Sequence, residues 1–220
     1  GKVDGVYHTY YDNQKINYKG KKKGDHFIDT LFTYYNTGKI QRKSVYKNGR
    51  LHGQYIAYHE NGKTMITCNY ENGKLTGQYS EYYENGQLSQ KGQYQNGFKT
   101  GKGYGYYKSG QMFSEGHFEN NRYQGIWIVY YPNGKIKQYG AYSHGLATGF
   151  WKFFYPNGNL MKQGNYHQDK KIKIWELFLE NGLLINRVYF INGIANGPVW
   201  FYENGELVKK GKFINGELTD

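Results

Sequence analysis

The chain has 220 residues, of which 31 are glycine, 26 are tyrosine and only 3 are proline, and its formal net charge is +12. Abundant glycine with so little proline excludes collagen and proline-rich linkers. The longest apolar run, Ile126 to Tyr131, has six residues, far fewer than the roughly 18 that a membrane-spanning helix needs. Scarce alanine and plentiful tyrosine, phenylalanine and isoleucine favour strands over helices, so we expect an all-β chain.

Turn dipeptides recur every 24 residues. The first series is Asn13-Gln14, Thr37-Gly38, Asn61-Gly62, Asn85-Gly86, Ser109-Gly110, Asn133-Gly134, Asn157-Gly158, Asn181-Gly182 and, one residue early, Asn204-Gly205. A second series, from Asn48-Gly49 to Asn215-Gly216, alternates with it. Asparagine followed by glycine between aromatic and aliphatic runs predicts a tight hairpin turn of type I′. The sequence therefore predicts nine β-hairpin units of about 24 residues.

No linker and no change of composition interrupts this period, so residues 1–220 are predicted to form one continuous repeat domain. Hairpins at a constant interval favour an elongated repeat protein in which each unit contacts only its neighbours. Because wide sheets twist, we expect a twisted antiparallel meander.

Counting outward from Asn61-Gly62 predicts the pairing inside a hairpin. The predicted pairs are His59 with Thr64, Ala57 with Ile66, and Tyr55 with Cys68. The same count places Tyr7, Tyr79, Trp127 and Trp151 opposite Gly20, Gly92, Gly140 and Gly164. Each ring is predicted to lie over the glycine opposite. Cys68 stands at such a glycine position, so we interpret it as a small buried residue without chemistry.

A row of aromatic residues stands four positions before each turn glycine. Its first six members are our candidates for binding a partner: Tyr10, Tyr34, Tyr58, Tyr82, Tyr106 and Tyr130. Tyrosine suits interfaces because it combines a large contact area with a polar tip. The residues predicted opposite the row are polar in the first half of the chain, as Asn17 and Gln41 are, so we expect this face to be wetter there.

The positive charge is concentrated at the N-terminal end, where the first 50 residues contain eleven basic and four acidic residues. The candidate basic patch is Lys19, Lys21, Lys22, Lys23, Arg42, Lys43 and Lys47. Such a patch would attract an acidic protein, anionic phospholipid or nucleic acid. A solvated, lysine-rich cap that protects the sheet end from aggregation explains the same charges, and both interpretations stay open.

No arrangement typical of catalysis is found. The seven histidines, His8, His26, His52, His59, His117, His144 and His167, show no metal-ligand spacing. The glycine-rich stretch from Gly101 to Gly105 lies in a strand pattern with no helix after it, which argues against a phosphate-binding loop. We therefore predict no enzyme activity, no catalytic residue, no metal and no cofactor.

The repeated pattern Gly-x-Trp/Tyr-x-x-Tyr-Tyr-x-Asn-Gly-x-Leu-x-x-x-Gly-x-Tyr-x-Asn-Gly resembles the MORN repeat in its bacterial type-2 form. Its best copies are Gly77 to Gly97, Gly125 to Gly145 and Gly149 to Asp169, and the likeness covers essentially the whole chain. The first unit departs from it, with Lys22 in place of an aromatic residue, and so does the eighth, with Leu179 for tyrosine and Val188 for glycine.

That family includes YwqK-like antitoxins. The resemblance implies a non-catalytic scaffold of stacked hairpins, with roles in toxin neutralisation, protein assembly and contact with acidic phospholipids. We expect a soluble scaffold that binds a protein partner, with a toxin as one candidate. The alternatives are an anionic membrane, a glycan or another acidic ligand bound by the rings and the basic end, or a structural spacer. Sequence-specific binding of nucleic acid is not expected, and both the cytoplasm and export after loss of a leader stay open as compartments.

Overall fold

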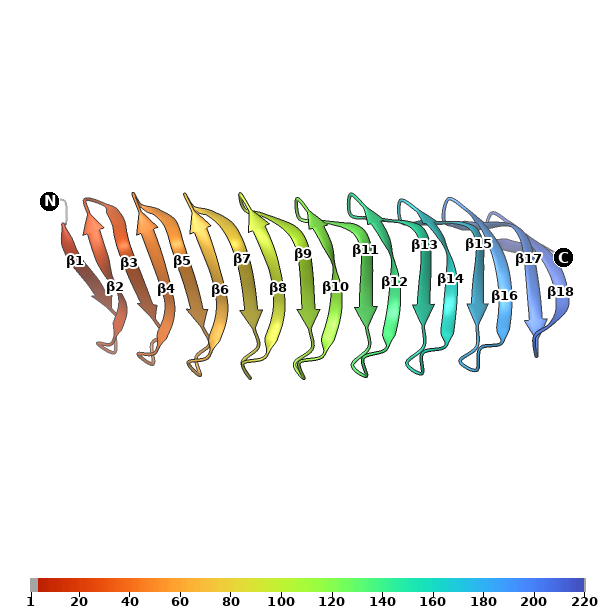
Figure 1. The fold of residues 1–220 in the computed structure, drawn as a ribbon, viewed down its shortest axis with the longest axis horizontal. Coiled ribbons are helices and arrows are strands. Elements are labelled where there is room, and N and C mark those ends of the chain that lie inside the picture. The colour runs from red at the N-terminus through yellow and green to blue at the C-terminus, as the bar shows by residue number, and fades with distance from the viewer. Residues whose placement is uncertain (1–3, 220) are drawn as a thin grey trace. The chain divides into compact units, whose positions relative to one another are not determined.

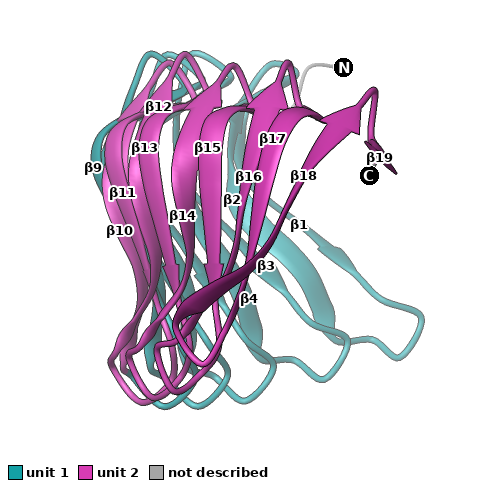
Figure 2. Cartoon of the chain, turned by 90° about the vertical axis from the view of Figure 1, so that its right-hand side faces the viewer, with its two compact units in different colours: residues 1–110 teal, residues 111–220 magenta. Residues whose placement is uncertain are grey.

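The computed structural model describes residues 4–219, which contain 19 β-strands and no helix. Figure 2 shows two compact units, residues 1–110 and 111–220. The boundary lies at Ser109-Gly110, one of the predicted repeat turns. The continuity of residues 1–220 as a single domain stays a prediction. The described part of the chain has no helix that is long and apolar enough to cross a membrane.

Unit 1 is a run of antiparallel strands in chain order (Figure 1). Its strands are β1 (Gly5–Tyr10), β2 (Ile16–Lys23), β3 (His26–Tyr34), β4 (Ile40–Lys47), β5 (Arg50–Tyr58), β6 (Thr64–Glu71), β7 (Lys74–Tyr82), β8 (Leu88–Gln95) and β9 (Phe98–Tyr106). Each of these strands pairs with the next.

Unit 2 repeats this arrangement. Its strands are β10 (Met112–Glu119), β11 (Arg122–Tyr130), β12 (Ile136–Ser143), β13 (Leu146–Phe154), β14 (Leu160–His167), β15 (Lys170–Phe178), β16 (Leu184–Ile191), β17 (Ile194–Glu203), β18 (Glu206–Ile214) and β19 (Glu217–Thr219). All successive pairs are antiparallel. The prediction of an all-β chain of consecutive hairpins is therefore confirmed.

The two turn series differ in conformation. In the second series both central residues have positive φ, as at Asn48 (51°) and Gly49 (74°), which is the predicted type I′ turn. In most of the first series only the second residue does, as at Gly62 (87°), whose N–H donates to the carbonyl of His59 at 2.8 Å; in the first unit this residue is Gln14 (64°). This is a type I turn followed by a glycine bulge. The type I′ prediction is thus wrong for most of the first series, although Asn204 and Gly205 do form such a turn.

The glycine bulge shifts the register beside the turn. Ala57 pairs with Ile66 and Tyr55 with Cys68, as predicted, but Thr64 pairs with Tyr58 and not with His59. Most members of the tyrosine row consequently face aliphatic residues, in unit 1 and in unit 2, with Tyr58 opposite Thr64 as an exception. The observed pairs include Tyr10 with Ile16, Tyr34 with Ile40, Tyr82 with Leu88, Tyr130 with Ile136 and Phe154 with Leu160. The polar partners that suggested a wetter N-terminal half are therefore not the actual partners.

The aromatic residue three positions before each turn glycine links successive hairpins. The Tyr35 hydroxyl donates to the backbone carbonyl of Tyr58 at 2.7 Å, and the bond recurs with the period of the turns. Equivalent bonds run from Tyr11 to Tyr34, Tyr83 to Tyr106, Tyr131 to Phe154 and Tyr155 to Phe178. His59 occupies the same position, with its Nε2 atom 2.8 Å from the carbonyl oxygen of Tyr82. These bonds explain why tyrosine or histidine stands at this position in most repeats, whereas Leu179 in the eighth repeat has no polar group to donate.

A second kind of link places a tryptophan over a glycine. Trp151 pairs with Gly164 in register, as predicted, but its ring lies instead over Gly140 on the preceding strand, where an added Cβ would overlap the indole. The Trp151 indole N–H donates to the carbonyl of Ala141 at 3.2 Å. A bulge at Gly149, whose φ is 68°, turns the ring toward that strand. Figure 2 shows the bent strands of unit 2 that result.

The rings and the small residues between them form the core on one side of each unit, here named the core face. In unit 2, Ala147, Trp151 and Trp175 are buried, and Tyr142, Phe153, Tyr166 and Phe190 pack against them. In unit 1, Leu31, Ala57, Cys68 and Ser44 are buried. The other side is named the tyrosine-row face, because alternation along the strands places the tyrosine row there.

Candidate functional site on the tyrosine-row face

The pleat of β2 and β4 divides the predicted basic patch between the two faces. Successive side chains of a strand point to opposite sides, so five of the seven basic residues share the tyrosine-row face. These five are Lys19, Lys21, Lys23, Lys43 and Lys47. The remaining two, Lys22 and Arg42, lie on the core face. Lys22 Nζ lies 4.2 Å from the centroid of the Tyr7 ring and 4.8 Å from that of Phe27.

A cross-strand row combines charge with an aromatic ring. Lys19 on β2 pairs with Phe32 on β3, and Phe32 pairs on its other side with Lys43 on β4. Directly opposite residues on one face have Cβ atoms about 5 Å apart, so the Phe32 ring has a lysine stem on each side. Within residues 4–219 neither lysine forms an ion pair. Both ammonium groups are therefore available to an anion.

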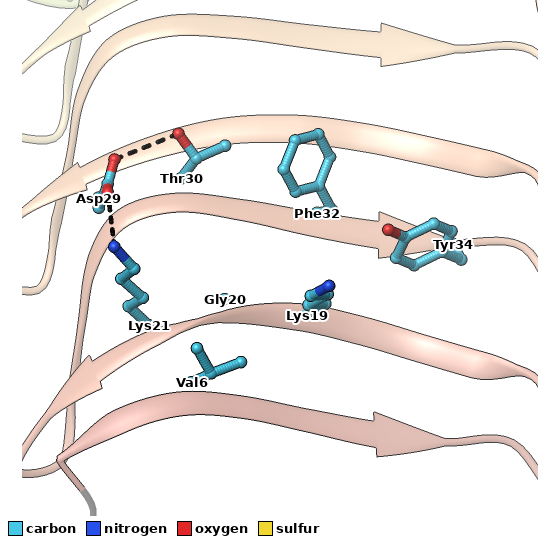
Figure 3. A pocket seen from close by; sticks show the side chains of 8 residues that line it. All are labelled: Val6, Lys19, Gly20, Lys21, Asp29, Thr30, Phe32 and Tyr34. Atoms are coloured by element: carbon cyan, nitrogen blue, oxygen red, sulfur yellow. Dashed lines mark hydrogen bonds and ion pairs between the residues drawn. The ribbon is translucent and has the colours of Figure 1, made fainter.

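The same face is hollowed between β1, β2 and β3 (Figure 3). The pocket has a volume of about 290 Å³. It is lined by Val6, Lys19, Gly20, Lys21, Asp29, Thr30, Phe32 and Tyr34. Two residues of the predicted basic patch, Lys19 and Lys21, thus meet one residue of the predicted tyrosine row, Tyr34. The sequence indicates the two lysines by their charge and Tyr34 by its position in the repeat.

One acidic residue lies in this pocket. Asp29 Oδ2 is 3.7 Å from Lys21 Nζ, and the two side chains are 61% and 58% exposed. Such an exposed and long ion pair contributes little to stability, so an incoming ligand can replace it at small cost. The Asp29 carboxylate also accepts a hydrogen bond from the Thr30 hydroxyl at 3.3 Å. The pocket therefore offers two cations with one partly competing anion.

The tyrosine row itself is mostly half-buried. Tyr10 is 56% exposed, whereas Tyr34, Tyr58, Tyr82, Tyr106 and Tyr130 are intermediate. The Tyr130 hydroxyl donates to Glu115 Oε1 at 2.7 Å. Burial, together with this hydrogen bond to a carboxylate, raises the pKa of Tyr130 to about 12. Five of the six rings are therefore partly covered by their neighbours, and Tyr10 is the exposed one.

Exposed apolar residues in unit 2 were missed by the sequence analysis. Ile126, Phe150 and Ile174 are 59%, 47% and 41% exposed and recur every 24 residues. Each follows the bulge position that Gly125, Gly149 or Lys173 occupies with positive φ. The middle position of the Gly-x-Trp pattern was the available signal, because a bulge re-aims the residue inside it.

The described residues hold no group of three or more His, Cys, Asp or Glu side chains that could bind a metal ion. Two histidine side chains contact the backbone: His59 Nε2 lies 2.8 Å from the carbonyl oxygen of Tyr82, and His52 Nδ1 accepts from the Asn72 N–H at 3.5 Å. Cys68 is 4% exposed, and burial raises the pKa of its thiol to about 11. The chemistry on the tyrosine-row face is that of cations and rings, which suits binding.

The repeat unit also identifies the family to which the chain belongs. The sequence profile of a MORN repeat variant matches residues 30–48, 51–72, 75–96, 99–120, 123–144, 148–168 and 196–215, which together make up more than half of the chain. The chain belongs to the MORN repeat variant family. The matched segments of this MORN repeat protein leave out most of the first and eighth units, the two in which the sequence departs from the repeat pattern.

No protein with a curated description matches this MORN repeat protein. Among solved structures it aligns with the crystal structure of TcdB2-TccC3-TEV at 12% identity and a TM-score of 0.26, covering 91% of this chain and 13% of that one. It aligns with the Photorhabdus luminescens Tc holotoxin pore at 13% identity and a TM-score of 0.21, covering 97% of this chain and 15% of that one. The MORN repeat protein thus spans about a seventh of those chains, and superpositions this poor carry no argument.

Proposed function

We propose that this MORN repeat protein is a non-catalytic scaffold that binds an acidic protein partner on the tyrosine-row face of unit 1. The observation that supports the proposal most is the gathering of five lysines on that face of β2 and β4, beside Phe32 and Tyr34. Positive charge steers an acidic partner and sets its orientation. The adjacent rings supply the apolar contact area that charge alone lacks.

The size of an ordinary interface indicates how much of unit 1 takes part. Four strands spaced about 4.8 Å apart and about 26 Å long present roughly 500 Å². A stable complex needs about 800 Å² from each partner. A partner seated on β1 to β4 would therefore extend over β5 to β7, where Tyr58 and Tyr82 continue the row.

The antitoxin resemblance narrows the class of partner. We extend the proposal to a toxin that is neutralised when the scaffold covers an acidic part of its surface. Co-expression tests this extension: a toxin captured by the intact chain should arrest growth alone and lose that effect when the scaffold is present. A captured partner that is harmless alone contradicts the extension and leaves the scaffold function standing.

The test of the scaffold function uses the full chain immobilised and exposed to nuclease-treated lysate of its source at two salt concentrations. One variant carries Lys19→Glu, Lys43→Glu and Lys47→Glu. A control variant carries Lys102→Glu, Lys170→Glu and Lys210→Glu, which alters three exposed lysines elsewhere and changes the net charge equally.

We expect one acidic protein to be retained by the wild type and by the control but lost by the first variant. Retention of only lipid or nucleic acid, released at high salt, overturns the proposal in favour of an anionic ligand. Equal capture of a protein by all three forms refutes the tyrosine-row face of unit 1 as the binding surface. Capture of nothing by any form favours a spacer.

A further inference from the structure

The pocket of unit 1 exists because one repeat departs from the others. Lys19 pairs with Phe32 and Lys21 with Ile28, so Gly20 faces the three residues from Asp29 to Leu31. The middle residue of that bulge is Thr30, whereas the equivalent position in unit 2 carries Ile126, Phe150 or Ile174. A threonine fills less space than these side chains, so the bulge leaves a hollow that the residue types of unit 2 would occupy.

The lining of the hollow has two chemical sides. Lys19 and Lys21 stand two positions apart on β2, on the same face, and Figure 3 shows the Lys21 ammonium group turned toward Asp29. Val6, which is 59% exposed, and the half-buried Phe32 supply an apolar surface. Tyr34 contributes a phenol at the end of the hollow. Cations beside an apolar surface select a ligand that combines an anion with an apolar group.

We propose that this pocket binds a carboxylate and the apolar or aromatic side chain next to it, presented by an acidic segment of the partner protein. The inference rests on the proposed function and assigns the position at which that partner is anchored. Lys19, which has no ion pair within the described residues, takes the carboxylate, and Phe32 with Val6 takes the apolar side chain.

Asp29 distinguishes a carboxylate from a phosphate. Its carboxylate lies in the pocket wall, 3.7 Å from Lys21 Nζ. A phosphate close to two negative charges at neutral pH would be repelled by Asp29 more strongly than a carboxylate with a single charge. A carboxylate needs only Lys19 and can leave the pair of Lys21 and Asp29 in place. The pocket therefore favours an acidic peptide over a phosphorylated ligand or a phospholipid headgroup.

The volume supports an anchor of one or two side chains. At about 290 Å³ the pocket lies at the lower end of the range for small-molecule sites. Such a pocket holds the central contact of a larger interface, in which a few residues carry most of the binding free energy. The rest of the partner would then contact the lysines and rings on the neighbouring strands.

The test measures fluorescence anisotropy of a labelled peptide of alternating glutamate and phenylalanine, titrated with the full chain. Two further peptides replace all glutamates by glutamine or all phenylalanines by alanine. The pocket variants are Lys19→Gln, which removes the cation, and Thr30→Ile, which fills the hollow with a residue used in unit 2. Their controls are Lys102→Gln and Thr100→Ile on β9, outside the pocket. Thermal unfolding checks that all variants fold.

We expect each pocket variant to raise the dissociation constant about tenfold, as loss of a charge-assisted contact does, with both controls within about twofold of wild type. Both altered peptides should bind at least about tenfold more weakly. Equal binding of the peptide by wild type and pocket variants overturns the inference. Two other results overturn it as well. One is displacement of the labelled peptide by inorganic phosphate as effectively as by unlabelled peptide, and the other is Lys19-dependent binding to phosphatidic acid vesicles.

The outcomes also separate the inference from the proposed function. A partner protein that is lost with Lys43→Glu and Lys47→Glu, but is still bound by Lys19→Gln and Thr30→Ile, leaves the scaffold function in place and refutes the pocket as its anchor. The opposite result is that the peptide binds in the pocket while no acidic protein is captured from lysate. It refutes the proposed function but keeps the pocket as a binding site.

Discussion

The hydroxyl of Tyr83 donates a hydrogen bond to the backbone carbonyl of Tyr106, 2.7 Å away and one repeat further along the chain. The neighbouring Asn85 makes a parallel link, since its side-chain amide donates to the carbonyl of Lys108 at 2.8 Å. These bonds hold the next hairpin against the turn of the previous one. The tyrosine before the turn therefore stabilises the repeat, whereas the tyrosine one residue earlier lies on the tyrosine-row face.

Removing one such hydroxyl should destabilise the chain measurably. Tyr83→Phe leaves the Tyr106 carbonyl without this donor in a part-buried place, and we expect a loss of about 1 kcal/mol in the free energy of unfolding. Tyr82→Phe, one residue away on the tyrosine-row face, is the matched control and should cost less than about 0.5 kcal/mol. Urea denaturation followed by circular dichroism compares the two. Equal losses would contradict a structural role for the hydroxyl of Tyr83.

The strand glycines of the core face have different neighbours in different repeats, and substitution by alanine should reveal the difference. A Cβ at Gly140 would overlap the indole ring of Trp151. A Cβ at Gly92 meets the flexible end of Lys99, 3.2 Å away at Cε, and makes an ordinary contact with the Lys102 carbonyl oxygen at 3.9 Å. We expect Gly140→Ala to cost about 2–3 kcal/mol, because the ring must leave its place. Gly92→Ala should cost less than about 1 kcal/mol.

Denaturation measures the loss of stability in the Gly140→Ala and Gly92→Ala variants, and tryptophan fluorescence reports the position of the ring. Gly140→Ala should also change the emission of the native state, since the indole is displaced from a site where it is 3% exposed. A stable Gly140→Ala variant with unchanged emission would show that the ring does not rest on this glycine.

The bulge of the eighth repeat contains a strained residue. Lys173 has φ of 59°, at the position where Gly125 and Gly149 stand in the two preceding repeats. A side chain in this left-handed region costs about 1–2 kcal/mol that glycine does not incur. We expect Lys173→Gly to raise the free energy of unfolding by about 0.5–1 kcal/mol, after allowance for the greater freedom of glycine in the unfolded chain.

Lys173→Ala separates the backbone from the charge in this experiment. Alanine removes the ammonium group but keeps a Cβ in the same conformation, so it should give no gain. If both variants are equally stabilised, the cause is the lost positive charge and the strain argument is wrong.

The regular spacing of turns predicted the hairpins and most of their register. The count failed beside the turn, where Thr64 meets Tyr58, because the glycine bulge adds a residue to the loop. Tyr55 does pair with Cys68, because a second irregularity, at Met65, restores the register further from the turn. A count within one hairpin also contains no information on contacts between hairpins, so it missed that Trp151 lies over Gly140 instead of Gly164.

The candidate site could be predicted only in parts. Lys19, Lys21 and Tyr34 were each proposed from composition or from the repeat, and strand alternation alone could have moved Lys22 and Arg42 to the other face. The hollow that joins the first three residues could not be foreseen. It depends on a three-residue bulge opposite Gly20 and on the small size of Thr30 within it.

The last prediction concerns the buried thiol and alkaline pH. Burial raises the pKa of Cys68 from 9.0 to about 11, because the thiolate loses its hydration among the side chains of the core face. The folded state therefore holds the proton more tightly than the unfolded state. The stability that results is fully present below pH 9, and it is lost as the pH rises from 9 toward 11, where only the unfolded thiol ionises at first.

Comparing wild type with Cys68→Ala across pH 8 to 11 isolates this effect, since all other groups titrate in both proteins. The stability of the wild type should fall relative to the variant by about 2–3 kcal/mol over that interval, as a pKa difference of two units requires. Alkylation by iodoacetamide at pH 8 should accordingly be slow in the native state and fast in urea. A constant stability difference across the whole range, together with fast native alkylation, would mean that Cys68 is not a buried residue of the core face.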